Sequence, residues 1–313
     1  MDLKEKCLSG VFGAVVGDAV GVPYEFRSRN EMKQNPCLDM VGYGTYNKPC
    51  GTWSDDSSML LATMDGVRDG EFDLDEIMLN FLDWQVYGKY TQDGFMFDIG
   101  STTTKALDNY RYSLDPTDSG LKEETSNGNG SLMRILPVAF YLYLKYGEEA
   151  MLNKKAVRLV ADLSALTHAH RISKKACVIY VAVAIRLLSS PTNEAIIQGL
   201  EDVKTYAQNE QAFERIYGEE FFNLPLESLS SKGYVVDTLE SSLRITYLAK
   251  DYEDGVLKAV NLGDDTDTTA SVTGGLLGLK FGFDGIKKDW LNKIRRKEFV
   301  ENTCEEFIKN ITK

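Results

Sequence analysis

Residues 263–278 read GDDTDTTASVTGGLLG, a turn crowded with acids and hydroxyls that leads into a small, apolar segment. Asp264, Asp265 and Asp267 lie next to one another in sequence, although like charges this close together repel. A helix cap uses one such side chain and does not require three. The turn is also not an EF-hand calcium loop, because a count from Asp265 finds no Gly at the sixth position and no Glu at the twelfth.

Another acidic turn, the first in chain order, lies in GTWSDDSSMLLATMDGV, residues 51–67, and has the same form as the turn at residues 263–268, the second in chain order. Ser54, Asp55 and Asp56 precede an apolar pattern that predicts a helix over residues 59–67. Ser54 is a good N-cap, and the helix dipole favours acids in a first helical turn. Capping would therefore explain this turn if it stood alone.

Taken together, the two acidic turns favour a metal site over simple capping. Hard divalent cations such as Mg²⁺, Mn²⁺ and Ca²⁺ take oxygen ligands from Asp, Thr, Ser and water. Several carboxylates that converge in a partly buried space need positive charge to compensate them. We therefore expect the two turns to share a pair of divalent cations.

Two further segments place a carboxylate on a turn. In GDAVGVPYEF, Asp18 follows one glycine, and a second glycine and a proline separate it from Glu25, which predicts that a helix ends there. Glu25 is then either part of an ordinary loop or a further ligand or proton-transfer group. In FDIGSTTTKAL, Asp98 and Gly100 come just before another helix, for which Ser101 or Asp98 would be the cap.

A glycine loop precedes the most apolar helix of the chain, in SNGNGSLMRILPVA. Gly128, Asn129, Gly130 and Ser131 form either a tight turn or, with free backbone N–H groups at a helix N-terminus, an anion site suited to a diphosphate. The GxxxxGK[ST] spacing of a Walker loop is absent.

The chain has two histidines, both in LTHAHR. His168 and His170 are one residue apart and do not share a helix face, so joint metal ligation is not expected. The residues favour a ring that stacks on a ligand, or a hydrogen-bonded core histidine.

Hydrophobic periodicity predicts an all-α protein with one compact domain over residues 1–313. Pro137 should kink the apolar segment 131–146 or mark its first turn. Gly10, Gly13 and Gly17 recur at close to helical spacing and leave a smooth face on which another backbone can approach. A capping box at Asp73 and Glu76 predicts the start of another amphipathic helix. The same periodicity predicts amphipathic helices over residues 148–166, 172–189, 193–208, 235–250 and 299–311.

Composition narrows the class of protein. The 313 residues are 43% hydrophobic and 26% charged, with a net charge of −12, which argues against disorder and against a broad nucleic-acid-binding surface. The five cysteines are scattered without a CxxC pair, as suits reduced thiols in a cytosol. We find no signal peptide, no apolar run long enough for a membrane span, and no heptad seam, and expect a cytoplasmic monomer.

Six motifs, in order, resemble those of the ADP-ribosylglycohydrolase family: GDAVGVPYE, GTWSDDSSM, FDIGSTTTKAL, GNGSLMR, THAH and GDDTDTTASVTGGLLG. They run from residue 17 to residue 278, nearly the whole chain. The resemblance implies a compact, all-α orthogonal bundle with a binuclear Mg²⁺ or Mn²⁺ centre in a cleft.

The resemblance also implies roles for individual residues. Ser54, Asp55 and Asp56 would ligate one metal, Asp267 would bridge, and Asp265 and Thr268 would complete the second. Ser54 stands where the family more often has Thr, and Asp264 where it usually has Gly; Asp264 receives no assigned role. Glu25 matches the mobile acid of the family, and His168 matches the histidine near the ligand. Asp98 and Gly100 match the segment found in arginine-specific members. The loop that holds the phosphates and the ribose is matched by Gly128, Asn129, Gly130 and Ser131.

The implied activity is metal-dependent hydrolysis of the bond between ADP-ribose and a protein side chain, most simply arginine. Glu25, Asp56 and Asp98 are the candidate catalytic residues, and an ADP-ribosylated protein or ADP-ribose is the expected partner. The alternatives are a serine linkage, a small ADP-ribosyl metabolite, or a non-catalytic relative that binds ADP-ribose. Intact acids in both turns argue against the last.

Overall fold

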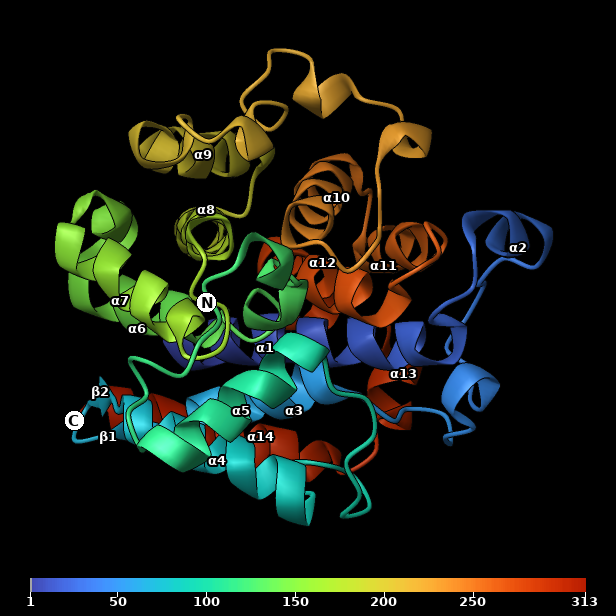
Figure 1. Cartoon of the computed structure of the whole chain (residues 1–313). Coiled ribbons are helices and arrows are strands. Elements are labelled where there is room, and N and C mark those ends of the chain that lie inside the picture. The colour runs from blue at the N-terminus through green and yellow to red at the C-terminus, as the bar shows by residue number, and fades with distance from the viewer. Residues whose placement is uncertain (1) are drawn as a thin grey trace.

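The computed structural model describes residues 2–313 and is built almost wholly of helices (Figure 1). Strands β1 (Val67–Arg68) and β2 (Glu71–Phe72) form a two-residue antiparallel ladder. The helices are α1 (Leu3–Gly21), α2 (Arg29–Gln34), α3 (Asp55–Met64), α4 (Leu74–Tyr87), α5 (Ser101–Ser113), α6 (Pro137–Tyr146), α7 (Lys154–Ala165), α8 (Arg171–Ser189), α9 (Asn193–Ala207), α10 (Val235–Leu248), α11 (Tyr252–Val260), α12 (Thr266–Phe281), α13 (Lys288–Lys293) and α14 (Lys297–Ile311). The prediction of an all-α fold is confirmed.

Helices α1 and α12 form the centre of the bundle and run antiparallel in direct backbone contact. A Cβ atom on Gly13 would lie 2.3 Å from the Gly274 carbonyl oxygen, and one on Gly17 would lie 2.1 Å from the Ala270 carbonyl oxygen. Only glycine lets two backbones approach this closely. The glycine spacing in the first helix is therefore a packing surface, as the sequence pattern indicated.

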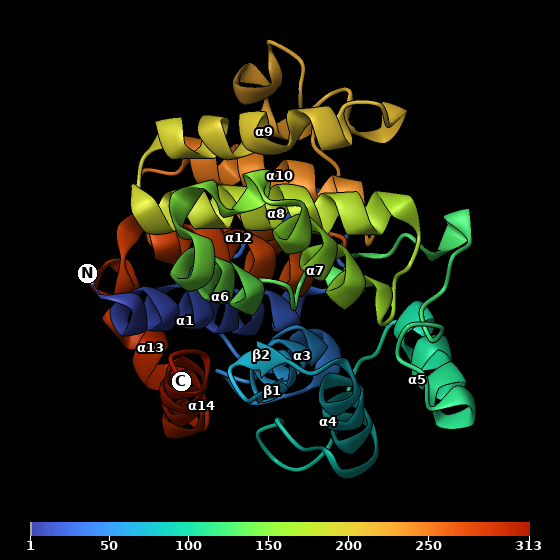
Figure 2. The same ribbon diagram turned by 90° about the vertical axis from the view of Figure 1, so that its left-hand side faces the viewer.

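The other helices cover this central pair on two sides. Figure 2 shows α8, α9 and α10 stacked beyond α12, while α3, α4 and α14 lie beyond α1. The C-terminal end of α1 reaches the first turn of α12, where a Cβ on Gly21 would lie 2.4 Å from the Cα of Asp267. This crossing fixes where the second acidic turn can be placed.

The N-terminal segment corrects one expectation. Residues Leu3–Tyr24 form a helix that by length and composition alone could cross a membrane, whereas no such run was expected from the sequence. Its most apolar window is 94% buried inside the fold, because α1 is the core helix that α12 covers. An apolar helix surrounded by other helices has this composition without any membrane.

Several helix boundaries differ from those expected. Helix α3 begins at Asp55 rather than residue 59 and ends at Met64, so that its acids lie inside the first turn. Pro137 marks the first turn of α6, which is one of the two predicted outcomes, but residues 129–136 before it form a 3₁₀ segment and turns instead of the expected helix. The expected helix 148–166 is divided into a 3₁₀ segment and α7. At α4, Asp73 caps the helix by accepting from the backbone N–H of Glu76.

Candidate metal centre and ligand pocket

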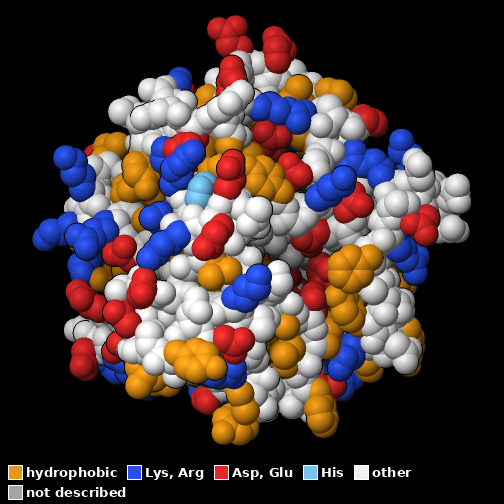
Figure 3. Space-filling view, viewed as in Figure 1, with side chains coloured by type: hydrophobic (Ala, Val, Ile, Leu, Met, Phe, Trp, Pro, Cys, Tyr) orange, Lys and Arg blue, Asp and Glu red, His pale blue; other side chains and the backbone are white. Residues whose placement is uncertain are grey.

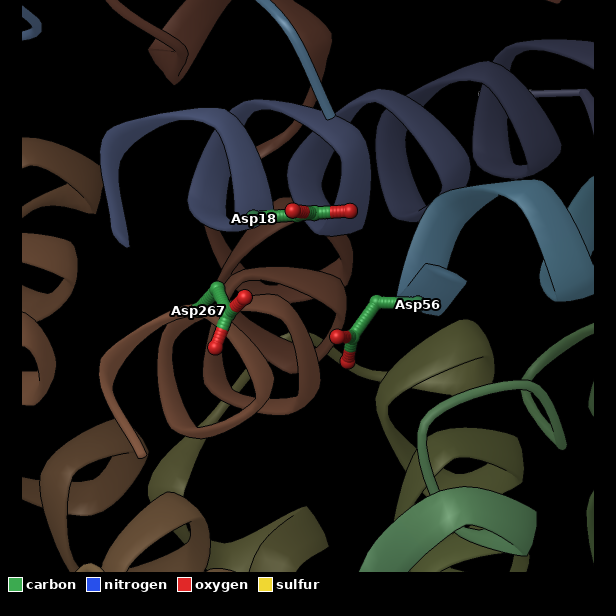
Figure 4. Close-up of side chains that lie close together, drawn as sticks. All are labelled: Asp18, Asp56 and Asp267. Atoms are coloured by element: carbon green, nitrogen blue, oxygen red, sulfur yellow. The ribbon is translucent and has the colours of Figure 1, made fainter. Parts of the chain in front are cut away.

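The first turns of α3 and α12 meet beside the end of α1 and bring their carboxylates together. Asp18, Asp56 and Asp267 each offer an oxygen within 4.8 Å of the others, and all three point into one space (Figure 4). Glu25, Asp265 and Asp267 form a second such group. Asp267 belongs to both groups, so the two acidic turns build one continuous cluster.

These carboxyl groups are buried among one another, and their pKa values shift accordingly. Loss of solvent raises the pKa of Asp55, Asp56 and Asp267 well above the usual range, and the neighbouring carboxylates raise it further. Burial also raises the pKa of Glu25, to about 8, with Asp98 as the next cause. Without compensating positive charge, the cluster therefore holds protons near neutral pH.

Four carboxylate oxygens of the cluster are left without a partner. Within residues 2–313, no donor reaches Glu25 Oε2, Asp56 Oδ1, Asp265 Oδ1 or Asp267 Oδ2. Buried polar atoms are rarely left in this state unless a ligand or ion satisfies them. Unpaired carboxylate oxygens from several turns are the donor set that hard divalent cations prefer, so the residues present fit such ions.

The hydroxyl and amide groups around the cluster hold the other carboxylate oxygens. Ser54 Oγ and Thr268 Oγ1 donate to Asp56 Oδ2, at 3.0 and 3.1 Å. Asn129 Nδ2 donates to Asp265 Oδ2 at 2.8 Å. Asp56 and Asp265 thus each have one oxygen fixed by the protein and one left free, which orients them for a ligand.

The sequence interpretation gave Asp18 no role, but the structure shows that it binds the backbone next to the acidic cluster. It accepts from the backbone N–H groups of Ser54 and Ser57, both at 3.0 Å, and from Ser57 Oγ at 2.6 Å. Burial raises the pKa of Asp18 to about 6, against these hydrogen bonds, which lower it. Asp18 therefore anchors the N-terminus of α3 and holds the Ser54–Asp56 turn in place.

The Glu25 turn is tied to the second acidic turn through the backbone. Phe26 N–H donates to the Asp264 carbonyl, and Asp264 N–H donates to the Arg27 carbonyl, both at 2.7 Å. Phe26 and Asp264 have φ values of 65° and 58°. Asp264 thus occupies a left-handed position that Gly and Asp adopt more readily than other residues, and its role is conformational. The N-cap of α12 is Asp265.

A cavity of about 320 Å³ opens over the cluster. Asp55, Asp265 and Thr268 lie at its acidic end together with Glu25 and Asp98, whereas Ser54, Asp56 and Asp267 are buried outside its lining. Figure 3 shows acidic side chains gathered in a hollow of this face, with hydrophobic side chains at its edge.

Asp98 and Gly100 both line the cavity, but neither Ser101 nor Asp98 caps α5 as the sequence suggested. Gly100 is the N-cap residue and no side chain bonds there. Asp98 has φ 57° and burial raises its pKa, while a hydrogen bond from Tyr46 lowers it. Tyr46 also bonds Glu25, and it was missed because its loop carries no motif.

The glycine loop lines the cavity through Gly128, Asn129 and Gly130, but it is not the N-terminus of a long helix as expected. Helix α6 starts only at Pro137, and the backbone N–H of Asn129 donates to the Gly233 carbonyl. Ser131 lies outside the lining, with its hydroxyl next to Ser164 and Cys177 in the core.

The two histidines have different environments, as their spacing predicted. His168 is buried at the cavity wall, and burial together with Arg134 lowers its pKa to about 3. His170 caps α8 by accepting from the backbone N–H of Ile172.

Comparison with known proteins gives this architecture a family. The sequence matches the family model described as ADP-ribosylglycohydrolase over residues 1–313, and the chain belongs to that family. It is 27% identical to ADP-ribosylarginine hydrolase Tri1 of Serratia proteamaculans (strain 568), over 97% of this chain and 79% of that protein. It is 26% identical to the ADP-ribosyl-(dinitrogen reductase) glycohydrolase of Rhodospirillum rubrum, over 94% and 92% of the two chains.

A solved structure of an ADP-ribosylglycohydrolase-related protein complex shares the fold, with a TM-score of 0.82 and 26% identity over 99% of each chain. The family predicted from the six motifs is thus confirmed. The protein is a hydrolase of the ADP-ribosyl glycohydrolase class, with acidic clusters that could hold a metal ion.

Proposed function

We propose that this protein removes ADP-ribose from protein side chains, with arginine as the attachment residue and two divalent cations, Mg²⁺ or Mn²⁺, as cofactors. The observation that carries the proposal is the set of four unpartnered carboxylate oxygens in the acidic cluster, two of which belong to Glu25 and Asp265 in the cavity lining. The names of the relatives from Serratia proteamaculans and Rhodospirillum rubrum support the reaction class.

Six residues from the two acidic turns would hold the cations. Four are the aspartates of these turns, Asp55, Asp56, Asp265 and Asp267, some of which have unpartnered oxygens. The other two, Ser54 and Thr268, carry the hydroxyl groups that donate to Asp56. Bound divalent cations supply Lewis-acid chemistry, which aligns oxygen ligands and makes water more acidic. Asp18 would not be a ligand, because its oxygens accept hydrogen bonds from the start of α3, and it would position the Ser54–Asp56 turn.

The protein side chains would then act on the substrate as follows. Cleavage of the glycosidic bond builds positive charge on the ribose ring, which the surrounding carboxylates stabilise. Burial and the nearby Asp98 raise the pKa of Glu25 to about 8, and Glu25 would take a proton from the attacking water or give one to it. Asp98 would pair with the guanidinium of the leaving arginine, because a carboxylate binds that group with two parallel hydrogen bonds.

The glycine loop would receive the opposite end of the ligand. Gly128, Asn129 and Gly130 line the cavity together with His168 and would hold the phosphates and the distal ribose. Ser131 would contribute through its backbone, since its side chain faces the core.

The test measures free ADP-ribose released from arginine-modified and serine-modified peptides with Mg²⁺, with Mn²⁺ and with EDTA. We expect cation-dependent release from the arginine peptide alone. Release from the serine peptide would refute the linkage, and no release with metal bound would point to a small metabolite or to a binding role. Asp98→Asn should lower arginine turnover by about 10²-fold; full turnover by this variant would refute the role of Asp98.

We also propose that residues 1–313 act as one domain and as a cytoplasmic monomer. The single core that runs through α1 and α12, and five cysteines that are all free, support this. Size-exclusion chromatography with light scattering tests the oligomeric state, and a dimer at micromolar concentration would contradict it.

A further inference from the structure

We propose that Arg134 and Thr167 are positioning residues that fix His168 as the neutral tautomer with its proton on Nε2, so that the ring donates a hydrogen bond into the cavity. Only the identity of the acceptor, a phosphate or ribose oxygen, depends on the function proposed above. Arg134 lies in the turn before α6, and Thr167 and His168 follow α7.

The three side chains form a chain of hydrogen bonds in the core. Arg134 Nη2 donates to Thr167 Oγ1 at 2.9 Å and to the Leu163 carbonyl at 3.1 Å. Thr167 Oγ1 lies 2.8 Å from His168 Nδ1. Arg134 and Thr167 are fully buried, and His168 is 2% exposed.

The Arg134 guanidinium group sets the direction of both hydrogen bonds that link Arg134, Thr167 and His168. A guanidinium group only donates, so the Thr167 hydroxyl accepts from Arg134. A hydroxyl has one hydrogen, and within residues 2–313 the only other partner of Thr167 Oγ1 is His168 Nδ1. Thr167 therefore donates to Nδ1, which must be a lone pair, and the ring proton is on Nε2.

The other two states of the ring conflict with these contacts. A proton on Nδ1, in either the other neutral tautomer or the charged ring, would leave the buried Thr167 hydroxyl hydrogen without an acceptor, which is costly. The charged ring would in addition face the Arg134 guanidinium, the charge that with burial lowers the pKa of His168. Neutral Nε2–H is the one state that satisfies all three groups.

The Nε2 edge of the ring faces the glycine loop at the cavity wall. A Cβ on Gly128 would lie 3.4 Å from His168 Nε2, and one on Gly130 would lie 2.9 Å from Cε1. Glycine at both positions leaves that edge uncovered by side chains. Within residues 2–313 no hydrogen bond to Nε2 is formed, so its proton is free for a ligand.

The proposal also accounts for a buried cation that has no carboxylate partner. Arg134 stacks on the Phe81 ring at 4.8 Å, and its Nε and Nη1 atoms lack acceptors within residues 2–313. Such a group is expensive to bury, and packing alone does not require it. Its effect is to place a hydrogen-bond donor in the wall of the cavity, where it can donate to a phosphate or hydroxyl oxygen of a ligand.

The tautomer can be observed directly, since the chain has only two histidines. Protein labelled with ¹⁵N-histidine gives long-range ¹H–¹⁵N spectra with two rings, and His170→Asn, which preserves an N-cap residue at α8, assigns them. We expect His168 in wild-type protein to show a protonated Nε2 and an unprotonated Nδ1 at neutral pH. A protonated Nδ1 would overturn the proposal, whether or not the protein hydrolyses any substrate.

Two matched variants test the role of Thr167. Thr167→Ser retains the hydroxyl and should retain the wild-type spectrum. Thr167→Val removes the donor, so the spectrum should become a mixture of tautomers, and binding of ADP-ribose in the presence of Mg²⁺ should weaken about 10-fold by calorimetry. An unchanged tautomer and unchanged affinity in Thr167→Val would overturn the proposal; if that variant does not fold, the wild-type spectrum still decides.

Discussion

The acidic cluster predicts that removal of divalent cations makes the stability of the protein fall as pH rises. Glu25 has an ordinary pKa of 4.5 in the unfolded chain and about 8 in the folded protein without ions. Below about pH 4.5 both states hold the proton, and the stabilising contribution of protonated Glu25 is fully present. It is lost progressively as pH rises from about 4.5 to about 8, because over this range unfolding releases a proton that the folded state still holds.

The size of the effect follows from the number of protons involved. One extra bound proton changes the free energy of unfolding by about 1.4 kcal/mol per pH unit. Glu25 alone should then remove about 2.5 kcal/mol between about pH 5.5 and pH 7.5. Asp55, Asp56 and Asp267 shift in the same direction and make the slope steeper. This is a large share of the roughly 5–15 kcal/mol that stabilises a typical protein.

Urea unfolding, followed by tryptophan fluorescence, measures this slope. Trp53, Trp84 and Trp290 are all fully buried, and Trp53 directly precedes the first acidic turn. EDTA-treated protein should lose stability over this pH range, and protein saturated with Mn²⁺ should not, because the cations replace the protons. Glu25→Gln removes one titrating group and should make the EDTA slope shallower by about one proton. Equal stability of the EDTA-treated protein at both pH values would refute the reasoning.

Three substitutions test the scaffold around the cluster. Gly17→Ala forces a Cβ to 2.1 Å from the Ala270 carbonyl oxygen and should cost at least about 1–3 kcal/mol by urea unfolding; no change would contradict the helix contact. Asp18→Asn turns an acceptor partly into a donor against the N-terminus of α3, and should weaken Mn²⁺ binding in calorimetry by more than about 10-fold. Asp264→Gly keeps the left-handed turn, so its melting temperature and turnover should match wild type within error, and a large loss would show that the carboxylate matters.

Much of the architecture is readable in the sequence because the relevant signals are local. The spacing of Gly10, Gly13 and Gly17 predicted a backbone contact, and the hydrophobic periodicity predicted most of the helices. The acidic turns and the glycine loop were recognisable because each motif is continuous in the chain. Ordered over 262 residues, from 17 to 278, they were sufficient to identify the family.

The parts that could not be predicted depend on contacts between distant segments. Asp18 looked like part of a helix end, and only the meeting of α1 with α3 shows that it holds the backbone of Ser54 and Ser57. Tyr46 bonds Glu25 and Asp98 from a loop without a motif. The glycine loop does not lead directly into a helix, because residues 132–136 form turns and α6 begins only at Pro137.

The same features that stabilise the fold also limit how far the protein can neutralise its own acidic cluster. Two helix N-termini, those of α3 and α12, point their N–H groups toward the carboxylates. The first is used on Asp18, and the N–H of Thr268 donates to Asp267 Oδ1 at 2.9 Å. These bonds satisfy one oxygen of a carboxylate and leave the other free, as at Asp267 Oδ2. The backbone contact between α1 and α12 holds the acids too close together to separate, so the remaining charge has to be met by protons or by cations.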